Sequence, residues 1–460
     1  MIEFANSKAT ESRPRLRVLY ATAEAHPTYR PDVRVLFGHS LPEAGVDVDL
    51  VTVVEGVRAI PPWTGGRAFL RSASSRLRVM VADFAQQLSL FRRVRCGYDA
   101  LIVRDKPILG AIGWAAARLA GVPYCYWMSY PLPEHHLWLS RQADGRISAM
   151  RRLWLGLRGR LGMLVLQRLL VPRSDWLFVQ TVAMEAALRQ GSLRHDRVTA
   201  VPMGVDAERI PPASDALPQA LRNRRMAVYL GTLDRYRRPE LLVEAARIVA
   251  ERVPDFTMLI IGEADEPTDV GWLPRYATET GADHCVHFTG RLGPVDALAL
   301  ARHGSVGVSQ VPRSPFTEVG SPTKAVEYLA CGLPVVCNDQ PDQAHVVRES
   351  GGGWLCEFSA QGIATAILEA LADPEEARRR AESGRRWVTQ HRSYRVLGAL
   401  VADRLADLVA GDHVSRRFTA VGVAVRDRPA RQTAPGSVPV TGPITDRAPS
   451  RSHPTSPRQR

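Results

Sequence analysis

Short apolar segments recur along most of this chain, and each is followed by a longer segment with helical spacing. The segments RLRVLYA (15–21) and VDVDLVTVV (46–54) are the first two. Buried strands that alternate with helices are typical of parallel sheets, because each connection must cross a face of the sheet before the next strand begins. The alternation therefore predicts an α/β protein with doubly wound sheets, and it excludes a β-sandwich or a helical bundle.

One break divides this alternation in two. The segment PPASDALPQ (211–219) is rich in Pro and interrupts the pattern, as domain linkers do. We therefore predict two Rossmann-like domains that face each other across a cleft, over 15–210 and 226–390, joined by a linker over 211–225. The expected strands are 15–21, 46–54, 98–104, 122–128, 176–181 and 198–203 in the first domain and 226–231, 256–262, 285–290, 305–311, 333–338 and 353–357 in the second.

Both ends of the chain differ from its middle. Residues 1–14 are polar, and residues 411–460 are rich in Pro, Arg, Ser and Thr without apolar periodicity. Segments of such composition bury too little apolar surface to offset the conformational entropy lost on folding. We expect both ends to be disordered. Between the second domain and the tail, the spacing predicts a last helix over 391–410. Packing of this helix against the first domain is one of the arrangements open to it.

Positive charge is concentrated in parts of the chain, whose net charge is +13. Residues 145–174 contain seven Arg and no acidic residue. Within them, segment 150–171 places leucines on one helical face with arginines beside it, a pattern that favours an anionic membrane surface as partner. A buried core helix with arginines that reach solvent is the alternative. Nucleic acid is disfavoured as a partner, because 7% of the residues are aromatic and they do not interleave with a basic face.

The sequence carries no signal for secretion, membrane insertion or metal binding. It has no run of about 18 apolar residues, and its first residues lack a charged segment followed by an apolar one. Six cysteines occur without CxxC spacing, and the histidines form no HxxxH or HExxH motif. We expect a cytoplasmic protein with reduced thiols and with no metal or cofactor. If segment 150–171 binds lipid, the protein would lie at the inner face of the plasma membrane.

The segment PFTEVGSPTKAVEYLACGLPVV (315–336) carries the most specific chemistry. Its Ser321–Pro322 pair predicts a helix N-terminus capped by the serine. The backbone N–H groups of Thr323 and Lys324, the helix dipole and the lysine ammonium are suited to a phosphate or diphosphate. Glu327 shares a helical face with both residues, and its carboxylate can accept hydrogen bonds from the vicinal hydroxyls of a ribose. The alternative is an ordinary capped helix with a surface Lys–Glu pair.

SPTKAVEYLACGLPVV resembles the nucleotide-sugar motif of the family 4 glycosyltransferases. VPMGVD (201–206) and YLGTLDRYRRPELLVEA (229–245) are similar to two further motifs of that family, and the resemblance extends over about 15–410. It implies the GT-B fold and a retaining hexosyltransferase, with a nucleotide-diphosphate sugar as co-substrate and no metal. It also implies a glycan or lipid-linked acceptor, as in the synthesis of cell-surface polysaccharides or glycoconjugates.

The resemblance implies two cations on the donor diphosphate, an Arg and a Lys. The Arg position is Thr232 in this chain, and the Lys position is Arg237, whose guanidinium keeps the charge and can donate two parallel hydrogen bonds. Arg235 or Arg238 is then a candidate to replace the missing cation. By this matching, Arg237 and Lys324 are the expected catalytic groups, because they would stabilise the leaving diphosphate.

The family also carries two glutamates with seven residues between them. The second is Glu327, and the position of the first is Val319, so that Glu318 lies one residue away from it. Two arrangements remain open. Either a shift of the loop brings Glu318 to the donor sugar as a catalytic candidate, or the backbone N–H groups of Gly320 and Ser321 take its place.

Polar residues that follow first-domain strands are the candidates for the acceptor side. Ser129, His135 and His136 lie in the zone where many members of the family have a His. Asp105 and Lys106 directly follow another strand, and ligands bind at the carboxyl ends of parallel strands. A surface salt bridge would explain this last pair equally well.

Several alternatives stay open at this point. In the first loop, Arg30 or Arg34 faces either phosphate or solvent. A nucleotide-sugar epimerase of the same fold is a second function, and a catalytically weak sugar-binding protein is a third, favoured by the departures at Thr232 and Val319. A phosphorylase with a pyridoxal lysine is disfavoured, because the chain has few lysines. They are Lys8, Lys106 and Lys324.

Overall fold

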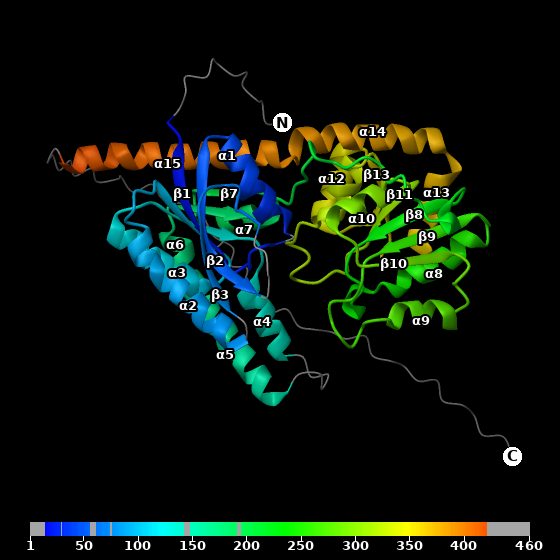
Figure 1. Cartoon of the computed structure of the whole chain (residues 1–460), viewed down its shortest axis with the longest axis horizontal. Coiled ribbons are helices and arrows are strands. Elements are labelled where there is room, and N and C mark those ends of the chain that lie inside the picture. Colours follow the sequence, from blue (N-terminus) through cyan, green and yellow to red (C-terminus); the bar gives the residue numbers. More distant parts are fainter. Residues whose placement is uncertain are drawn as a thin grey trace, which may run out of the picture. The chain divides into compact units, whose positions relative to one another are not determined.

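The computed structural model describes residues 14–28, 30–55, 61–73, 76–141, 148–190 and 195–420 (Figure 1). The compact unit considered below ends at Val414. The disorder expected at both ends of the chain falls largely outside the described residues. The last helix, however, runs to Ala420 and passes the expected start of the tail at Gly411. A single glycine lowers helix stability by about 1 kcal/mol, which does not end a helix that its neighbours continue.

The first sheet has seven parallel strands in the order β3-β2-β1-β4-β5-β6-β7. The strands are β1 Leu16–Ala21, β2 Val46–Glu55, β3 Ala68–Ala73, β4 Ala100–Arg104, β5 Tyr124–Met128, β6 Trp176–Val179 and β7 Val198–Ala200. Six of them lie at the positions that the sequence predicts. The pattern does not predict β3, because this edge strand, AFLRSA, mixes polar and charged residues with its apolar ones.

The second sheet has six parallel strands in the order β10-β9-β8-β11-β12-β13. The strands are β8 Arg225–Leu230, β9 Phe256–Ile261, β10 Val286–Gly290, β11 Val306–Ser309, β12 Val335–Asn338 and β13 Gly353–Cys356. All six coincide with expected segments. The two sheets confirm the predicted fold class of two doubly wound α/β domains.

Helices lie along both sheets (Figure 1). In the first domain they are η1 Asp32–Ser40, α1 Leu41–Glu43, α2 Arg76–Arg93, α3 Pro107–Ala120, α4 Leu132–Arg141, α5 Ala149–Val165, η2 Leu166–Leu170, α6 Val171–Arg173 and α7 Val182–Gln190. The remaining helices are η3 Gln219–Leu221, η4 Arg235–Arg237, α8 Glu240–Ala250, α9 Trp272–Glu279, α10 Pro294–Ala301, α11 Thr323–Ala330, α12 Pro341–Ser350, α13 Ala360–Ala372, α14 Pro374–His391 and α15 Tyr394–Ala420. In the part of the chain that the structure describes, no helix combines the length with the hydropathy needed to cross a bilayer.

Helix α15 packs on the first domain although it follows the second in sequence. Leu397, Val401 and Leu405 belong to the same buried cluster as Val18 and Tyr20 of β1. These leucines and valines are separated by about one helical turn, so they lie on one face of the helix. The last helix therefore contributes to the core of the first domain.

Each sheet reverses its strand order once, between β1 and β4 in the first domain and between β8 and β11 in the second. Ligands of open parallel sheets bind at the carboxyl ends of the strands beside such a reversal. The residues that directly follow these four strands are Thr22, Asp105, Gly231 and Gln310. The topology thus directs the search for a functional site to these positions.

Candidate functional site

Lys324 lies where the carboxyl end of β8 meets the first turn of α11. Gly231 follows β8 with a φ of 155°, and its backbone passes directly beside the lysine. A Cβ atom at position 231 would lie 2.7 Å from the Lys324 Cε, so a side chain there would displace the lysine. The Lys324 Nζ is 5.2 Å from the centroid of the Tyr229 ring, which supports the ammonium through a cation–π contact. The strand end therefore positions the ammonium.

Lys324 and Glu327 form a pair of opposite charges on one face of α11. Burial, aided by the nearby Arg237 guanidinium, lowers the pKa of Lys324 to about 8, against an opposing effect of Glu327. Burial raises the pKa of Glu327, and Lys324 and the Thr323 hydroxyl oppose this rise. When burial and a second cation disfavour the charged form of a lysine, a bound anion strongly stabilises that charged form. The pair is therefore suited to an anionic ligand.

Arg237 is the arginine of η4 whose charge affects Lys324. Its Nε is buried and has no hydrogen-bond partner within the described part of the chain. Its guanidinium lies 5.0 Å from the centroid of the Tyr236 ring. Buried donors in native proteins are normally satisfied, so an unsatisfied one requires an explanation. A bound phosphate oxygen would supply the missing acceptor.

Arg235 and Arg238 are held away from the lysine by other partners. The Arg235 Nε lies 3.2 Å from Asp269 Oδ1, and its guanidinium lies 4.5 Å from the centroid of the Trp272 ring. Arg238 forms an ion pair with Glu240. Residues of a 3₁₀ turn point in successive directions about 120° apart, so neighbouring arginines reach different surroundings. Contrary to expectation, neither arginine joins Lys324.

Thr232, where the sequence lacks the expected cation, donates from its Oγ1 to Asp265 Oδ2 at 3.4 Å. Asp265 in turn forms a 2.5 Å ion pair with Arg291, which follows β10. The sequence motifs do not single out this arginine. Its position directly after a strand is the signal that could have identified it, because β10 ends at the same edge of the sheet as β8.

The start of α11 differs from the expected arrangement. Pro322 is the residue before the helix, Thr323 is its first residue, and no side chain caps it. Ser321 is therefore not the cap. Its hydroxyl accepts a hydrogen bond from the Met203 N–H at 2.9 Å and donates to Asp342 Oδ2 at 2.6 Å. The Ser321 hydroxyl is engaged by these partners, which are distant in sequence, and it therefore does not cap the helix.

Glu318 and Gly320 are also engaged within the protein. Glu318 forms an ion pair with Arg313, in which Nη2 and Oε2 are 2.9 Å apart. The Gly320 N–H donates to a carbonyl of its own turn at 3.2 Å. Between them, the Val319 carbonyl accepts a hydrogen bond from Thr181 Oγ1 of the first domain at 3.1 Å. The Glu318 carboxylate and the Gly320 N–H, one from each arrangement that the sequence left open for the donor sugar, thus already have partners.

Gln340 fixes this loop, and the sequence pattern does not single it out. Its side chain is fully buried, and its Nε2 donates to the carbonyls of Thr317 at 2.5 Å and Gly320 at 2.9 Å. Its Oε1 accepts from the N–H groups of Asp342 and Gln343 at the start of α12. One amide therefore holds the segment before α11 and caps α12 at the same time. A polar residue shortly after a buried strand was the available signal.

A buried guanidinium ties the same loop to the first domain. Arg392 donates from two nitrogens to Asp342, at 3.1 and 2.7 Å, and from Nε to the Met203 carbonyl at 3.0 Å. It also donates to Ser321 Oγ at 3.1 Å. Both members of the ion pair are nearly inaccessible to solvent, with exposed side-chain fractions of 5% and 9%. This network orders the segment that precedes Lys324.

On the first domain, Asp105 organises the loop that follows β5. Its carboxylate accepts hydrogen bonds from the N–H groups of Ser129 at 2.7 Å and Tyr130 at 3.2 Å. The Ser129 hydroxyl donates to Asp105 at 2.5 Å and accepts from Arg104 at 2.9 Å. Ser129 is buried, so it supports the loop rather than presenting its hydroxyl to an acceptor as expected. Lys106 follows Asp105 and precedes α3.

A second buried network lies behind this loop. Arg104 Nη2 is 2.5 Å from Asp32 Oδ2, and both side chains are buried. Burial raises the pKa of Asp32, but Arg104 and Arg30 lower it more, so that the carboxylate stays charged with a pKa below its usual value. Arg30 also lies 3.1 Å from Glu24. Arg30 is therefore engaged by two carboxylates, an arrangement that the sequence does not indicate.

His135 and His136 lie in the first turns of α4. The Tyr130 hydroxyl is 2.6 Å from His135 Nδ1. The ring of Phe316, from the second domain, is 4.9 Å from that of His135 and 5.4 Å from that of Trp138, measured between centroids. Burial lowers the pKa of both histidines, that of His136 to about 4 with a contribution from a nearby arginine. Both are therefore uncharged near neutral pH.

Arg34 and Glu327 line one open pocket of about 250 Å³, just below the range of about 300–1,000 Å³ that is typical of small-molecule sites. The first domain and the loop after it contribute Pro31, Arg34, Val35, His39, Gly204, Val205, Asp206, Arg209, Ile210 and Pro211, and the second domain contributes Pro294, Val295, Leu298 and Glu327. The pocket thus combines the carboxylate expected at a ribose with a guanidinium of the first domain. Of the two alternatives for Arg34, this placement supports the ligand-facing one.

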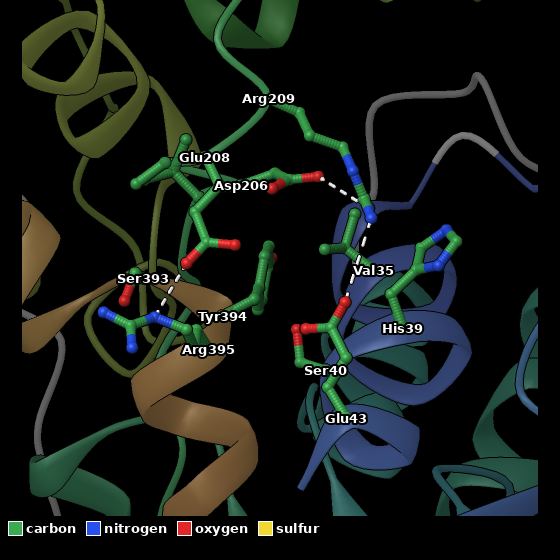
Figure 2. Close-up of a pocket in the computed structure, with 12 residues that line it drawn as sticks. Val35, His39, Ser40, Glu43, Asp206, Glu208, Arg209, Ser393, Tyr394 and Arg395 are labelled. Atoms are coloured by element: carbon green, nitrogen blue, oxygen red, sulfur yellow. Dashed lines mark hydrogen bonds and ion pairs between the residues drawn. The ribbon is translucent and has the colours of Figure 1, made fainter.

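Figure 2 shows a small crevice whose lining overlaps that of the pocket. Arg209 lies 3.4 Å from Asp206 and 3.9 Å from Glu43, and Arg395 lies 2.7 Å from Glu208 (Figure 2). In these ion pairs each guanidinium already has carboxylate partners. We therefore assign substrate chemistry to the open pocket and regard the crevice as a packed junction.

The chemistry available at this site follows from its charges. Lys324 and Arg237 can neutralise phosphate oxygens, and Glu327, which lines the open pocket together with Arg34, can accept hydrogen bonds from hydroxyl groups. In the described ranges, no group of three or more His, Cys, Asp or Glu is arranged to hold a metal ion. Fixed cations that meet a developing negative charge stabilise a transition state in which an anion leaves. The geometry is therefore suited to cleavage of a bond to a phosphate leaving group.

Two family models match the chain, one on each domain. Residues 32–204 match the glycosyl transferase 4-like domain, and residues 217–387 match the glycosyl transferases group 1. The Lys324 site lies in the second match.

Curated relatives match with modest identity. A GDP-mannose-dependent alpha-(1-6)-phosphatidylinositol monomannoside mannosyltransferase of Mycolicibacterium smegmatis is 29% identical over 47% of this chain and 57% of its own length. A D-inositol 3-phosphate glycosyltransferase of Corynebacterium glutamicum is 23% identical over 72% of this chain and 77% of its own. The match to the mannosyltransferase thus spans little more than half of that protein.

Solved structures share the fold along most of the chain. Sucrose-phosphate synthase from Thermosynechococcus elongatus superposes with a TM-score of 0.62 at 19% identity, over 89% of this chain and all of its own. HepE of Anabaena in complex with UDP-glucose superposes with a TM-score of 0.61 at 16% identity, over 85% of this chain and all of its own. At these identities the likeness concerns the fold.

Proposed function

Because the chain belongs to the family 4 glycosyltransferases of the GT-B fold, we propose that its two domains bind a nucleotide-diphosphate sugar and an acceptor at the site described above. The chain is an enzyme of the transferase class that moves a hexosyl group from a nucleotide sugar to a glycan or lipid acceptor. Retention of configuration at the transferred sugar is part of the proposal.

The observation that carries this assignment is the placement of Lys324 between the end of β8 and the start of α11, with Arg237 beside it. In the proposal, both cations contact the donor diphosphate, and the backbone N–H groups of the first turn of α11 add to them. As the bond from sugar to diphosphate breaks, negative charge grows on the leaving group, and these groups stabilise it. No metal is needed for this step in the proposal.

Glu327 is assigned to the donor ribose, because it lines the open pocket one helical turn behind Lys324. Replacing Glu327 by Ala removes charge-assisted hydrogen bonds and is expected to weaken donor binding by about 1.5–3 kcal/mol. The melting temperature of the unliganded protein should change little, because the carboxylate is disfavoured by burial. Isothermal titration with the donor tests this, and an unchanged dissociation constant would remove Glu327 from the site.

Donor binding should depend on pH through Lys324. The pKa of this lysine is about 8 in the protein without ligand, so the ammonium is present below that pH and is lost above it. Since the diphosphate binds the charged form, the dissociation constant should be constant below about pH 7 and rise about tenfold by pH 9. A Lys324→Arg variant keeps its charge throughout this range and should lose the dependence. Equal pH profiles for both proteins would contradict the assignment.

For the acceptor, we propose a glycan or sugar carried on a lipid, in the synthesis of a surface polysaccharide or glycoconjugate. The residues nearest to such an acceptor are those of the loop that Asp105 holds, together with Lys106, His135 and His136. The proposal extends to an anionic membrane surface as partner.

A donor panel tests the proposal at the level of binding. Thermal unfolding is followed with uridine, guanosine and thymidine diphosphate sugars, each added in excess. A ligand at 100 times its dissociation constant stabilises the folded state by about 2.7 kcal/mol, which is readily measured. We expect one nucleotide to raise the melting temperature of the wild type and to raise that of Lys324→Ala by a clearly smaller amount. If no nucleotide sugar has this effect, the donor site is assigned wrongly.

A further inference from the structure

We propose that the outward face of α5 binds the surface of a membrane that contains anionic lipids. The surface is separate from the donor site, and this inference does not depend on the proposed transferase chemistry. It rests on three features of one helix: exposed apolar side chains in a single stripe, arginines on both sides of the stripe, and a packing face that is used elsewhere.

Large apolar side chains of α5 lie in solvent. Their exposed fractions range from 45% for Leu161 to 75% for Met150. At about 100° per residue, all of them fall within an arc of about 100° on the helix. The stripe comprises Met150, Leu153, Trp154, Leu157, Leu161 and Leu164. Soluble proteins rarely expose so continuous an apolar patch unless it binds something.

The opposite face of α5 makes its contacts with the fold. Leu155 is buried, and a Cβ atom at Gly159 would lie 2.7 Å from Leu137 of α4. A Cβ atom at Gly162 would lie 3.1 Å from Pro133. The glycines thus let α4 approach closely, and α4 and α5 run side by side (Figure 1). The exposed stripe is therefore turned away from the packing face, and the alternative of a fully buried core helix is wrong.

Arginines border the stripe on both sides. By helical spacing, Arg151 and Arg158 lie along one edge of it and Arg160 along the other, and all three are exposed. Residues 145–174 include no Asp or Glu. When the leucines enter the acyl boundary of a leaflet, arginines at both edges reach the level of the headgroups. An anionic lipid surface complements this charge along the whole helix, and the indole of Trp154 is suited to the same interface.

The position of α5 links membrane binding to the acceptor side of the protein. Helix α4 begins four residues after β5, and the loop between them is the one that Asp105 holds at the carboxyl edge of the first sheet. Since α5 packs along α4, a membrane bound to α5 would lie next to the element that leads to the acceptor side. An acceptor attached to lipid would then be presented from the bilayer.

Vesicle sedimentation tests the proposal on the full chain. At low salt, the wild type is expected to bind vesicles of equal parts phosphatidylglycerol and phosphatidylcholine and to remain in solution with phosphatidylcholine alone. Replacing Arg151, Arg158 and Arg160 together by Glu should weaken binding at least about 100-fold, because each arginine near an anionic surface contributes several-fold to partitioning. The donor-induced rise in melting temperature should persist, which separates this test from that of the donor site.

Two further variants sharpen the experiment. A matched triple exchange of the exposed α14 arginines Arg378, Arg379 and Arg386 to Glu changes the net charge equally and should leave vesicle binding within about threefold of the wild type. Replacing Leu153 and Leu157 by Gln should weaken binding at least about tenfold while keeping the helix, because Gln is a good helix former. Circular dichroism and thermal unfolding verify that each variant folds.

Three results would overturn the proposal. The first is a wild type that stays in solution with anionic vesicles at low salt. The second is equal loss of binding in the α5 and α14 charge variants, which would show a nonspecific effect of net charge. The third is a dimer in sedimentation velocity that the Leu153 and Leu157 variant abolishes without effect on vesicles, which would show that a second copy of the chain covers the stripe.

Discussion

Replacing Lys324 by Ala is expected to lower kcat by about 100-fold or more, with a much smaller change in the donor KM. The reason is that negative charge on the diphosphate grows as the sugar leaves, so the ammonium contributes more to the transition state than to the bound donor. Loss of one preorganised charge-stabilising group costs about 3 kcal/mol in comparable sites. Steady-state kinetics on the donor identified by the thermal panel measure both constants.

Two variants serve as controls for this prediction. Lys324→Arg should recover part of kcat, because it restores the charge without the geometry of the ammonium. Arg235→Ala removes a cation from the neighbouring turn, yet it should lower kcat less than about threefold, since Arg235 pairs with Asp269 and lies on Trp272. If both Ala variants have similar effects, the charge at this edge acts without specific placement, and the role of Lys324 is wrong.

Arg392→Met is expected to destabilise the protein by about 3–5 kcal/mol. The substitution leaves the Asp342 carboxylate buried without its bidentate partner, and it also removes the bonds to Met203 and Ser321. Breaking a buried ion pair by removing one partner carries a cost of this size. Urea unfolding followed by tryptophan fluorescence measures the change.

The chain offers a matched control at nearly the same place. Arg395 and Glu208 are 2.7 Å apart, the same separation as Arg392 and Asp342, but their side chains are 65% and 60% exposed. Arg395→Met should therefore cost less than about 1 kcal/mol. The double variant Arg392→Met with Asp342→Leu should recover much of the stability, because no buried charge is left unpaired. If both arginine variants lose similar amounts of unfolding free energy, burial does not determine how much each ion pair contributes to stability.

The fold follows from the sequence because most of its strands are apolar and buried. Of the thirteen strands in the described residues, twelve are short apolar segments between helical ones, so local patterns are enough to locate them. The exception is β3, an edge strand whose mixed composition carries no such pattern. The far end of α15 was also misplaced, since helical spacing alone does not mark where a long helix stops.

The candidate site was predictable only in part, and tertiary contacts explain the difference. Lys324 and Glu327 share a helical face by spacing alone, and the structure keeps them together. The three arginines of the η4 region look alike in sequence, but Asp269 and Glu240 decide which of them remain near the lysine. Spacing along the chain cannot reveal such partners, because they come from other elements.

The acceptor side shows the same limit. Ser129 has the sequence position of a ligand-facing hydroxyl, yet Asp105 and Arg104 use it to order the loop. The buried pair of Arg104 and Asp32, and the amide of Gln340, are invisible to pattern analysis for the same reason. Buried polar groups acquire their roles from partners brought together by folding, and at least one partner of each of these groups is remote in sequence.

Hydrolysis of a nucleotide sugar with water as acceptor tests the assignment of the donor site most directly. Release of nucleoside diphosphate is measured for the wild type, Lys324→Ala and Arg237→Ala with the donor that stabilises the protein. We expect slow release by the wild type, and we expect either variant to release nucleoside diphosphate at least about 100-fold more slowly. All three proteins should be folded. Equal release by the wild type and both variants would contradict the placement of the leaving diphosphate at Lys324 and Arg237.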